Sequence, residues 1–170
     1  GGLFVPIIGA HKDGHDFIEM AVERGAAAVL SSRDVTELKK KYPEVRFWQV
    51  PDTRAALQEI GRYERERFRG KVIGVTGSSG KTTMRSMLAL ALSSERRVFQ
   101  TAGNANSQLG VPITLFQLAR SGAEIAALEL GMSEPGEMTR IASIARVDLA
   151  LITNIGTAHI ENLKTKENIL

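Results

Sequence analysis

The segment VIGVTGSSGKTT, residues 72–83, joins a short β-branched run to a glycine- and serine-rich turn and then to the start of a helix. In that order of elements, backbone N–H groups and the helix N-terminus can surround an anionic phosphate. Lys81 can reach the terminal phosphates of a nucleotide, and the Thr82 hydroxyl can ligate Mg²⁺. We therefore predict a phosphate-binding loop formed by Gly77, Ser78, Ser79, Gly80, Lys81, Thr82 and Thr83.

The glycine spacing of this loop departs from the strict pattern in one place. A glycine followed by four residues and Gly-Lys would require glycine where the chain has Val75, and the glycines stand at Gly74, Gly77 and Gly80 instead. The alternative interpretation is a turn that only ends a strand. Because a strand precedes the turn and a helix follows it, phosphate binding is the stronger interpretation.

The rest of the chain alternates apolar strand-like runs with segments of helical period, which predicts an α/β fold with a mostly parallel sheet and flanking helices. The N-terminal strands are expected within 3–9, 26–32 and 45–50, and a helix over 15–25 carries Phe17 and Met20 on its stripe. The helix after the phosphate loop, within 82–92, carries Met84, Met87, Leu88, Ala91 and Leu92 on its stripe.

We divide the chain into three parts. Residues 1–51 are predicted to form a small α/β domain, residues 52–70 a linker helix, and residues 71–170 the domain with the phosphate loop. Asp52 or Thr53 can cap the linker helix, and Gly70 can end it, so the boundary is expected near Gly70.

Composition excludes several other classes of protein. The 22 basic and 19 acidic residues give a formal net charge of +3, and 5% of the residues are aromatic, which is too little for a nucleic-acid-binding face. No apolar run reaches the roughly 18 residues of a membrane span, and the start lacks the features of a signal peptide. Without cysteine, disulfides and thiolate metal sites are excluded. We expect a cytoplasmic protein without membrane insertion, of unspecified oligomeric state.

Acidic and histidine side chains follow the predicted C-terminal strands. Glu129 ends an apolar run, where many nucleotide-hydrolysing proteins place an acidic residue for the metal or its water. Because a carboxylate there needs a cation or hydrogen-bond donors, we expect a metal-linked role. Asp148 begins its strand and is interpreted as structural. His159 follows the last strand, outside whose carboxyl end ligands bind, and is either a site residue or a structural histidine.

Four segments occur in the order and approximate spacing of the Mur ligase family: TGSSGKTT, GNANSQLGVPITL, LELGMSEPGEM and ITNIGTAHIENL. With FVPIIGAHKDGHDF near the start, the similarity extends over nearly the whole chain. The family usually has Thr-Asn or Ser-Asn before Gly-Lys, and this chain has Ser78-Ser79. The last two segments most resemble the members that join D-alanyl-D-alanine to UDP-N-acetylmuramoyl-tripeptide.

The resemblance implies ATP and Mg²⁺ as cofactors and assigns roles to matching positions. Lys81 would hold the β- and γ-phosphates and Thr82 the first Mg²⁺, while Glu129 and His159 would match further magnesium ligands. Their predicted action is charge neutralisation and alignment through the metal, without a protein nucleophile.

Polar residues in the turns match further positions of the family. Asn104 and Asn106 would lie near the γ-phosphate. The alternative is that they only form an Asn/Gly turn and contact no ligand. Asn154 would belong to the nucleotide site or only cap a strand end. For the run Asp13, Gly14, His15 and Asp16, a helix N-cap and a contact with the nucleotide-sugar substrate both stay open.

The implied activity is that of an ADP-forming, ATP-dependent carboxylate–amine ligase of peptidoglycan precursor synthesis that works through an acyl phosphate. Its substrates would be UDP-N-acetylmuramoyl-peptide and D-alanyl-D-alanine, with residues 1–51 as part of the UDP-sugar domain. Family members continue to a lysine, carbamylated in several of them, and to a C-terminal domain, so we expect this chain to be an inactive fragment. The alternatives are a ligase of folylpolyglutamate or cyanophycin type and a non-catalytic nucleotide-binding module.

Overall fold

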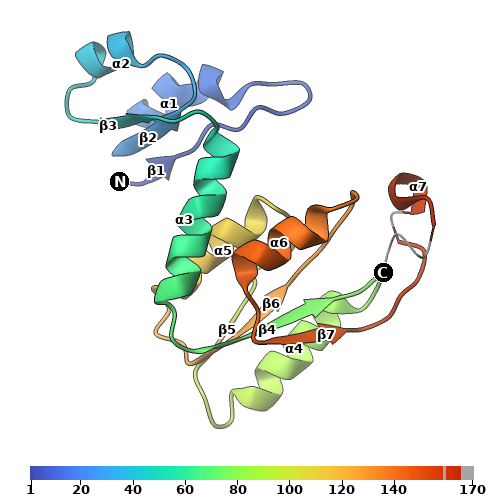
Figure 1. Ribbon diagram of the computed structural model, residues 1–170. Coiled ribbons are helices and arrows are strands. Elements are labelled where there is room, and N and C mark those ends of the chain that lie inside the picture. Colours follow the sequence, from blue (N-terminus) through green and yellow to red (C-terminus); the bar gives the residue numbers. More distant parts are fainter. Residues whose placement is uncertain (159, 166–170) are drawn as a thin grey trace. The chain divides into compact units, whose positions relative to one another are not determined.

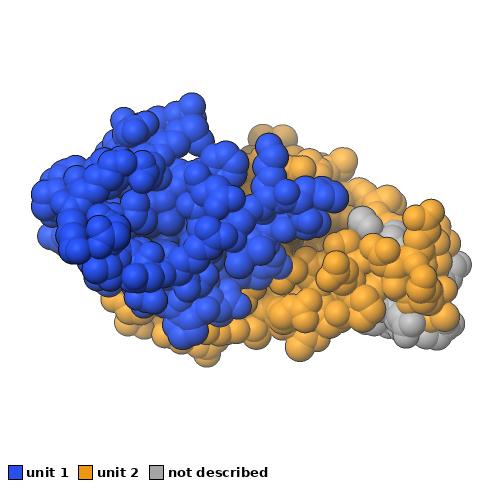
Figure 2. Space-filling view, turned by 90° about the horizontal axis from the view of Figure 1, so that it is seen from above, with its two compact units in different colours: residues 1–57 blue, residues 58–170 orange. Residues whose placement is uncertain are grey.

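The computed structural model describes residues 1–158 and 160–165. The chain divides into two compact units, residues 1–57 and 58–170 (Figures 1 and 2). Each unit has its own sheet, with the strand order β1-β2-β3 in the first and β5-β6-β4-β7 in the second. The prediction of an α/β fold with a small N-terminal unit and a mostly parallel sheet is confirmed. No helix in the described part of the chain is long and apolar enough to cross a bilayer.

The first unit is a three-stranded parallel sheet with short helices. Its strands are β1 (Leu3–Phe4), β2 (Ala28–Ser31) and β3 (Arg46–Gln49). Its helical elements are η1 (Gly14–Phe17), α1 (Ile18–Glu23) and α2 (Thr36–Lys41). Its buried core consists of Ile18, Val22, Val29, Val35, Val45 and Phe47.

Three details of this unit differ from the prediction. The first strand ends at Phe4, before Pro6, which has no N–H to continue the ladder. The buried pair of α1 is Ile18 and Val22, which pack in the core of this unit, whereas Phe17 and Met20 are 37% and 39% exposed. The helix α2 was not predicted, since its segment TELKKK has little apolar periodicity.

The predicted linker helix is α3 (Thr53–Arg67), and the division between the units falls inside it, after Leu57. Asp52 Oδ1 accepts two backbone N–H groups of its first turn, at 2.7 and 3.1 Å. The second half packs within the second unit, where a Cβ on Gly61 would lie 2.8 Å from Pro112. The compact unit therefore begins earlier than the boundary expected near Gly70, because this half of the helix lies against Pro112 and Ile144 of the second unit.

The second unit is built on four parallel strands with helices on both faces. The strands are β4 (Lys71–Thr76), β5 (Val98–Gln100), β6 (Ile125–Glu129) and β7 (Leu149–Ile152). The helices are α4 (Lys81–Leu92), α5 (Gly110–Leu118), α6 (Glu137–Ala145) and α7 (Ile160–Leu163). In Figure 1, α4 lies on one face of the sheet and α5 and α6 lie on the other. Because the strands are parallel, their carboxyl ends meet at one edge.

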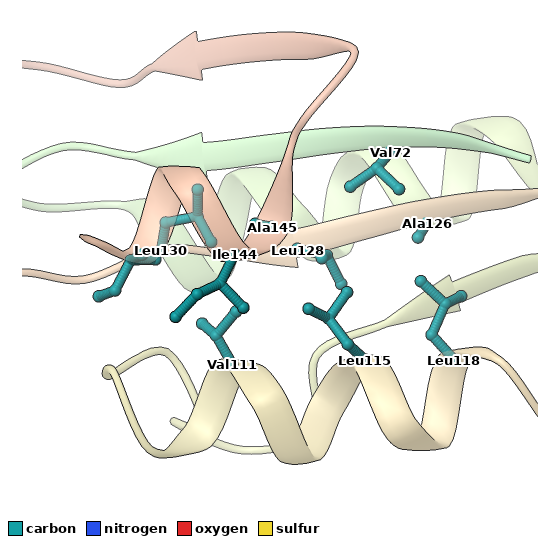
Figure 3. Close-up of a cluster of buried hydrophobic side chains, with 10 residues drawn as sticks. Val72, Val111, Leu115, Leu118, Ala126, Leu128, Leu130, Ile144 and Ala145 are labelled. Atoms are coloured by element: carbon teal, nitrogen blue, oxygen red, sulfur yellow. The ribbon is translucent and has the colours of Figure 1, made fainter. Parts of the chain in front are cut away.

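The core of this unit lies between β6, α5 and α6. Val111, Leu115 and Leu118 are spaced by four and three residues along α5 and point toward the sheet, with Leu128 of β6 near Leu115 (Figure 3). Each is at most 1% exposed, and burying such a side chain contributes about 1.5–3 kcal/mol. This packing fixes the sheet that positions the loops at its carboxyl edge.

The buried positions of α4 also differ from the predicted stripe. Arg85 and Ala89 are buried, whereas Met87 is 61% exposed. Residues 87–92 are all apolar, so periodicity in this half of the helix does not select one face. Contact with β4, β5 and β6 selects it, and this selection places a cation, Arg85, against the sheet.

Candidate functional site

The predicted phosphate loop lies between β4 and α4, at the carboxyl edge of the sheet. Gly77 has φ +131°, and a Cβ there would lie 2.2 Å from Thr153 Oγ1, so the position requires glycine. Gly80 precedes α4 in the left-handed region, with φ 77°. The first N–H groups of α4 have no carbonyl partner within the helix, and the helix dipole adds positive potential. The loop can therefore accept an anionic phosphate.

Lys81 opens α4, and its side chain folds back over the loop. Its Nζ donates a hydrogen bond to Gly77 O at 2.7 Å. A flexible ammonium with three donors can exchange a carbonyl acceptor for phosphate oxygens bound in the same loop. This contact places the Lys81 ammonium at the loop, where it bonds a neutral carbonyl rather than a carboxylate.

The segment after β7 holds the phosphate loop through Ser78 and Ser79. Asn154 Oδ1 accepts from Ser79 N at 3.1 Å, and Asn154 Nδ2 donates to Ser79 Oγ at 2.9 Å. Thr153 Oγ1 donates to Ser79 O at 2.6 Å, and Gly156 N donates to Ser78 Oγ at 2.8 Å. Asn154 thus does more than cap a strand, because its amide fixes the conformation of the loop.

Glu129 is the buried centre of the site, with an exposed fraction of 3%. Thr82 Oγ1 donates to its Oε2 at 2.9 Å, and Asn106 Nδ2 donates to its Oε1 at 2.7 Å. Arg85 Nη1 lies 3.4 Å from Oε2. These donors compensate a carboxylate withdrawn from water. Residues predicted separately on three segments are therefore brought together.

The arrangement fits a magnesium ion. Carboxylate and hydroxyl oxygens are the ligands that Mg²⁺ takes, and the Thr82 hydroxyl can keep donating to Glu129 while a lone pair faces a cation. Within residues 1–158 and 160–165, no group of three or more acidic, histidine or cysteine side chains could hold a metal. His159 lies outside the described residues, so its role as a ligand stays a prediction.

The other predicted asparagine is placed differently. Asn104 is exposed, and its backbone carbonyl accepts from Asn106 N at 2.7 Å in a tight turn after β5. In the described part of the chain, the Asn104 side chain takes part in no hydrogen bond to the loop or to Glu129. A contact between Asn104 and a γ-phosphate therefore stays a prediction.

A pocket of about 270 Å³ opens beside the phosphate loop. Gly77, Ser78, Lys81 and Asn154 line its polar side, and apolar side chains such as Met132 complete it. A small anionic group in this pocket would lie next to the Lys81 ammonium.

The polar run near the start of the chain forms a closed cluster in the first unit. Asp13 caps η1, accepting from His15 N at 2.8 Å and from His15 Nδ1 at 2.6 Å. His15 Nε2 accepts from Ser32 N at 3.0 Å, and Arg33 pairs with Asp13 and Asp16. The pKa of Asp13 is lowered, chiefly by the hydrogen bond from the His15 backbone N–H. The capping interpretation thus holds for Asp13, and His15 is buried within the fold.

Sequence reasoning missed several residues of the site. Arg85 and Thr101 contact Glu129, the latter by accepting from Glu129 N at 3.0 Å, and Thr153 contacts the loop. The spacing of four residues from Lys81 could have indicated Arg85, because it places both on one side of a helix. Thr101 and Thr153 carry no such local signal.

Comparison with known proteins gives a consistent assignment. A family model described as Mur ligase middle domain matches residues 75–170, and one described as Mur ligase family, catalytic domain, matches residues 1–65. The UDP-N-acetylmuramoyl-tripeptide–D-alanyl-D-alanine ligase of Bacillus subtilis is 41% identical over 167 residues, covering 98% of this chain and 36% of the relative.

Solved structures agree with the sequence comparison. A crystal structure of MurF from Acinetobacter baumannii superposes with a TM-score of 0.88 at 36% identity, covering 98% of this chain and 36% of that one. The MurF ligase of Thermotoga maritima in complex with ADP gives a TM-score of 0.85 at 37% identity, with 99% and 38% covered. The chain thus spans about a third of the length of the relatives it matches.

Proposed function

Because this chain belongs to the Mur ligase family, we propose that it is the nucleotide-binding part of a ligase that joins D-alanyl-D-alanine to UDP-N-acetylmuramoyl-tripeptide, with ATP converted to ADP and phosphate. The observation that carries the proposal is the meeting of the loop residue Thr82 with Glu129 and Asn106 at the carboxyl edge of one sheet. The names of the similar enzymes supply the substrates. Peptidoglycan precursor synthesis in the cytoplasm is the corresponding cellular role.

ATP would bind with its phosphates in the loop. The N–H groups at the start of α4 and the Lys81 ammonium face the anion, as the positive end of a helix favours. Thr82 and Glu129 would supply oxygen ligands for Mg²⁺, with His159 as a further proposed ligand. When bound, the ion neutralises phosphate charge and polarises the γ-phosphoryl group.

The proposed chemistry needs two anions to approach each other. A carboxylate oxygen of the peptide attacks the γ-phosphorus, the bond from phosphorus to the β–γ bridging oxygen breaks, and ADP leaves. The amine of D-alanyl-D-alanine then attacks the acyl carbon, loses a proton, and phosphate departs as the amide forms. Lys81 lowers the repulsion between carboxylate and nucleotide in the first step.

The pocket beside Lys81 is the proposed place of the reacting carboxylate. Its polar side contains Lys81, Ser78 and Asn154, and its apolar side contains Met132 and Met138. An apolar wall excludes water, which would otherwise hydrolyse an acyl phosphate. We assign residues 1–51 to part of the UDP-sugar domain, with Arg33 and Asp16 as exposed polar groups of that unit.

The test is phosphate release by the protein at its natural length with Mg·ATP, UDP-N-acetylmuramoyl-tripeptide and D-alanyl-D-alanine, omitting each component in turn. We expect turnover only with all components, and none with Lys81→Ala. Nucleotide binding without any dependence on the tripeptide or the dipeptide would contradict the proposed ligase. Turnover with another carboxylate and amine would instead indicate a ligase of folylpolyglutamate or cyanophycin type.

A further inference from the structure

Arg85 is a buried cation one helical turn beyond Lys81 on α4. Its side chain is 8% exposed, and its Nη1 lies 3.1 Å from Gly103 O and 3.4 Å from Glu129 Oε2. Its Nε is a buried donor without a hydrogen-bond partner among the described residues. A guanidinium leaves water only where another charge compensates it. Here that charge is the Glu129 carboxylate.

Glu129 therefore has two roles that compete for its charge. It is the partner of Arg85 in a buried ion pair, and it is the carboxylate proposed for the magnesium site. A guanidinium at 3.4 Å from Oε2 repels any bare divalent cation that approaches the same oxygen, and it does so strongly because the pair is shielded from water.

The remaining charges of the site favour an anion. Arg85 and Glu129 cancel as a pair, while Lys81 and the N-terminus of α4 leave the loop positive. A magnesium–nucleotide complex carries net negative charge and is attracted by this surplus, whereas a free divalent cation is not.

We propose that Arg85 is a positioning residue that serves as the internal counter-charge of Glu129, so that a divalent cation binds this site together with a nucleotide rather than alone. This inference rests on the proposed function, because it takes Glu129 as part of the magnesium site. Through Gly103 O, Arg85 also holds the turn that carries Asn106, which with Thr82 donates to Glu129.

The test compares binding of Mn²⁺ alone, of Mg·ADP and of Mg·ATP to Arg85→Met and to the wild-type protein at its natural length. Removing the guanidinium leaves Glu129 uncompensated, so we expect Mn²⁺ without nucleotide to bind about tenfold more tightly. Both magnesium–nucleotide complexes should bind about tenfold more weakly, because the positive surplus is lost. Calorimetry or manganese electron paramagnetic resonance measures the cation affinity directly.

Two variants serve as controls. Arg97→Met removes an arginine that is 76% exposed and 3.9 Å from Glu124, and it should leave the affinity for Mn²⁺ alone unchanged. Arg85→Lys keeps the positive charge but not the planar fork, so Mn²⁺ alone should bind as in the wild type. An Arg97→Met effect equal to that of Arg85→Met would overturn the inference, because net charge alone would then explain it.

The inference stays testable if Arg85→Met does not fold in metal-free buffer. In that case added Mn²⁺, or a second substitution Glu129→Gln, should restore folding, because either removes the unpaired buried charge. Failure of both to restore it would overturn the inference. So would a folded Arg85→Met protein whose affinity for Mn²⁺ alone is unchanged or weaker.

Failure of the proposed function gives a different result. A wild-type protein that binds neither Mg·ATP nor Mg·ADP would reject the nucleotide site, whatever the variants do with Mn²⁺. A wild-type protein that binds nucleotide, together with identical Mn²⁺ affinities in wild type and Arg85→Met, would reject only the role of Arg85.

Discussion

The polar cluster around His15 in the first unit and the cluster around Glu129 in the second are both buried, but they differ in what they leave available. His15 uses both ring nitrogens, donating from Nδ1 to Asp13 and accepting at Nε2 from Ser32 N. In the second cluster, the one hydrogen bond of the Lys81 ammonium within residues 1–158 and 160–165 goes to a loop carbonyl, and the Thr82 hydroxyl oxygen can still accept. The first cluster is closed, and the second is open to a ligand.

The His15 cluster is therefore expected to contribute to stability, and the Glu129 cluster to ligand binding. In the closed cluster the His15 ring and the Asp13 Oδ1 atom are engaged within the fold, and Ser32 N–H fixes the tautomer that has its proton on Nδ1. In the open cluster the loop N–H groups and Lys81 could form stronger hydrogen bonds with a phosphate, as our proposal expects, than they form within the chain. Substitutions in the two clusters should therefore change different measured quantities.

The largest effect is expected from Thr82→Val in the open cluster. The change keeps the shape of the side chain but removes the hydroxyl that contacts Glu129 and faces the proposed cation. In the protein at its natural length, we expect ATP turnover to fall by about 10³-fold, while the melting temperature changes little because Glu129 keeps Asn106 and Arg85. Phosphate release measures this, and turnover within a few-fold of wild type would place Thr82 outside the reaction.

His15→Ala addresses the closed cluster. Losing a buried ring and its hydrogen bonds should lower the free energy of unfolding by about 2–3 kcal/mol, with the nucleotide affinity of the folded protein unchanged. Urea unfolding and nucleotide titration measure the two quantities. The control is His11→Ala at an exposed position, which should change neither. A loss of nucleotide affinity without loss of stability would remove the distinction between the clusters.

Asn154→Ala removes the amide that holds the phosphate loop. Because the loop then samples other conformations before it binds phosphate, we expect the nucleotide affinity to fall about tenfold. Isothermal titration with Mg·ADP measures the change. Asn162→Ala, at an exposed position of α7, should bind as the wild type does. Equal Mg·ADP affinities of Asn154→Ala and Asn162→Ala would show that the Asn154 amide does not affect nucleotide binding.

The smallest effect concerns pH and Asp13. The pKa of Asp13 lies below the ordinary value of 3.8, and the largest cause is the hydrogen bond from the His15 backbone N–H to its carboxylate. A carboxyl whose pKa is lower in the folded protein adds stability above the unfolded value and loses it as pH falls through the folded value. We expect stability to decline below pH 3.8 less steeply in Asp13→Asn than in wild type. Identical urea-unfolding profiles across that range would contradict this contribution.

Much of the fold was predictable because its determinants are local. Alternation of apolar runs with helical segments indicated parallel α/β layers, and Gly77, Gly80, Lys81 and Thr82 indicated the phosphate loop from neighbouring residues alone. The predicted faces of α1 and α4 were only partly right: Met84, Leu88 and Leu92 are half-buried, whereas Phe17, Met20 and Met87 are exposed. Periodicity alone does not say which side of a helix meets the sheet. That choice is made by packing, which buries Ile18 in one case and Arg85 in the other.

The sequence by itself determined the phosphate loop, the α/β class and the acidic residue at the end of a buried strand, because each depends on residues within a few positions of one another. Only the tertiary structure decided which side chains meet. Glu129 is 23 residues from Asn106 and 47 from Thr82 along the chain, and parallel strands bring their carboxyl ends to one edge. The contacts of His15 and of Arg85 have the same cause, since each depends on how helices and loops pack on the sheet of their own unit.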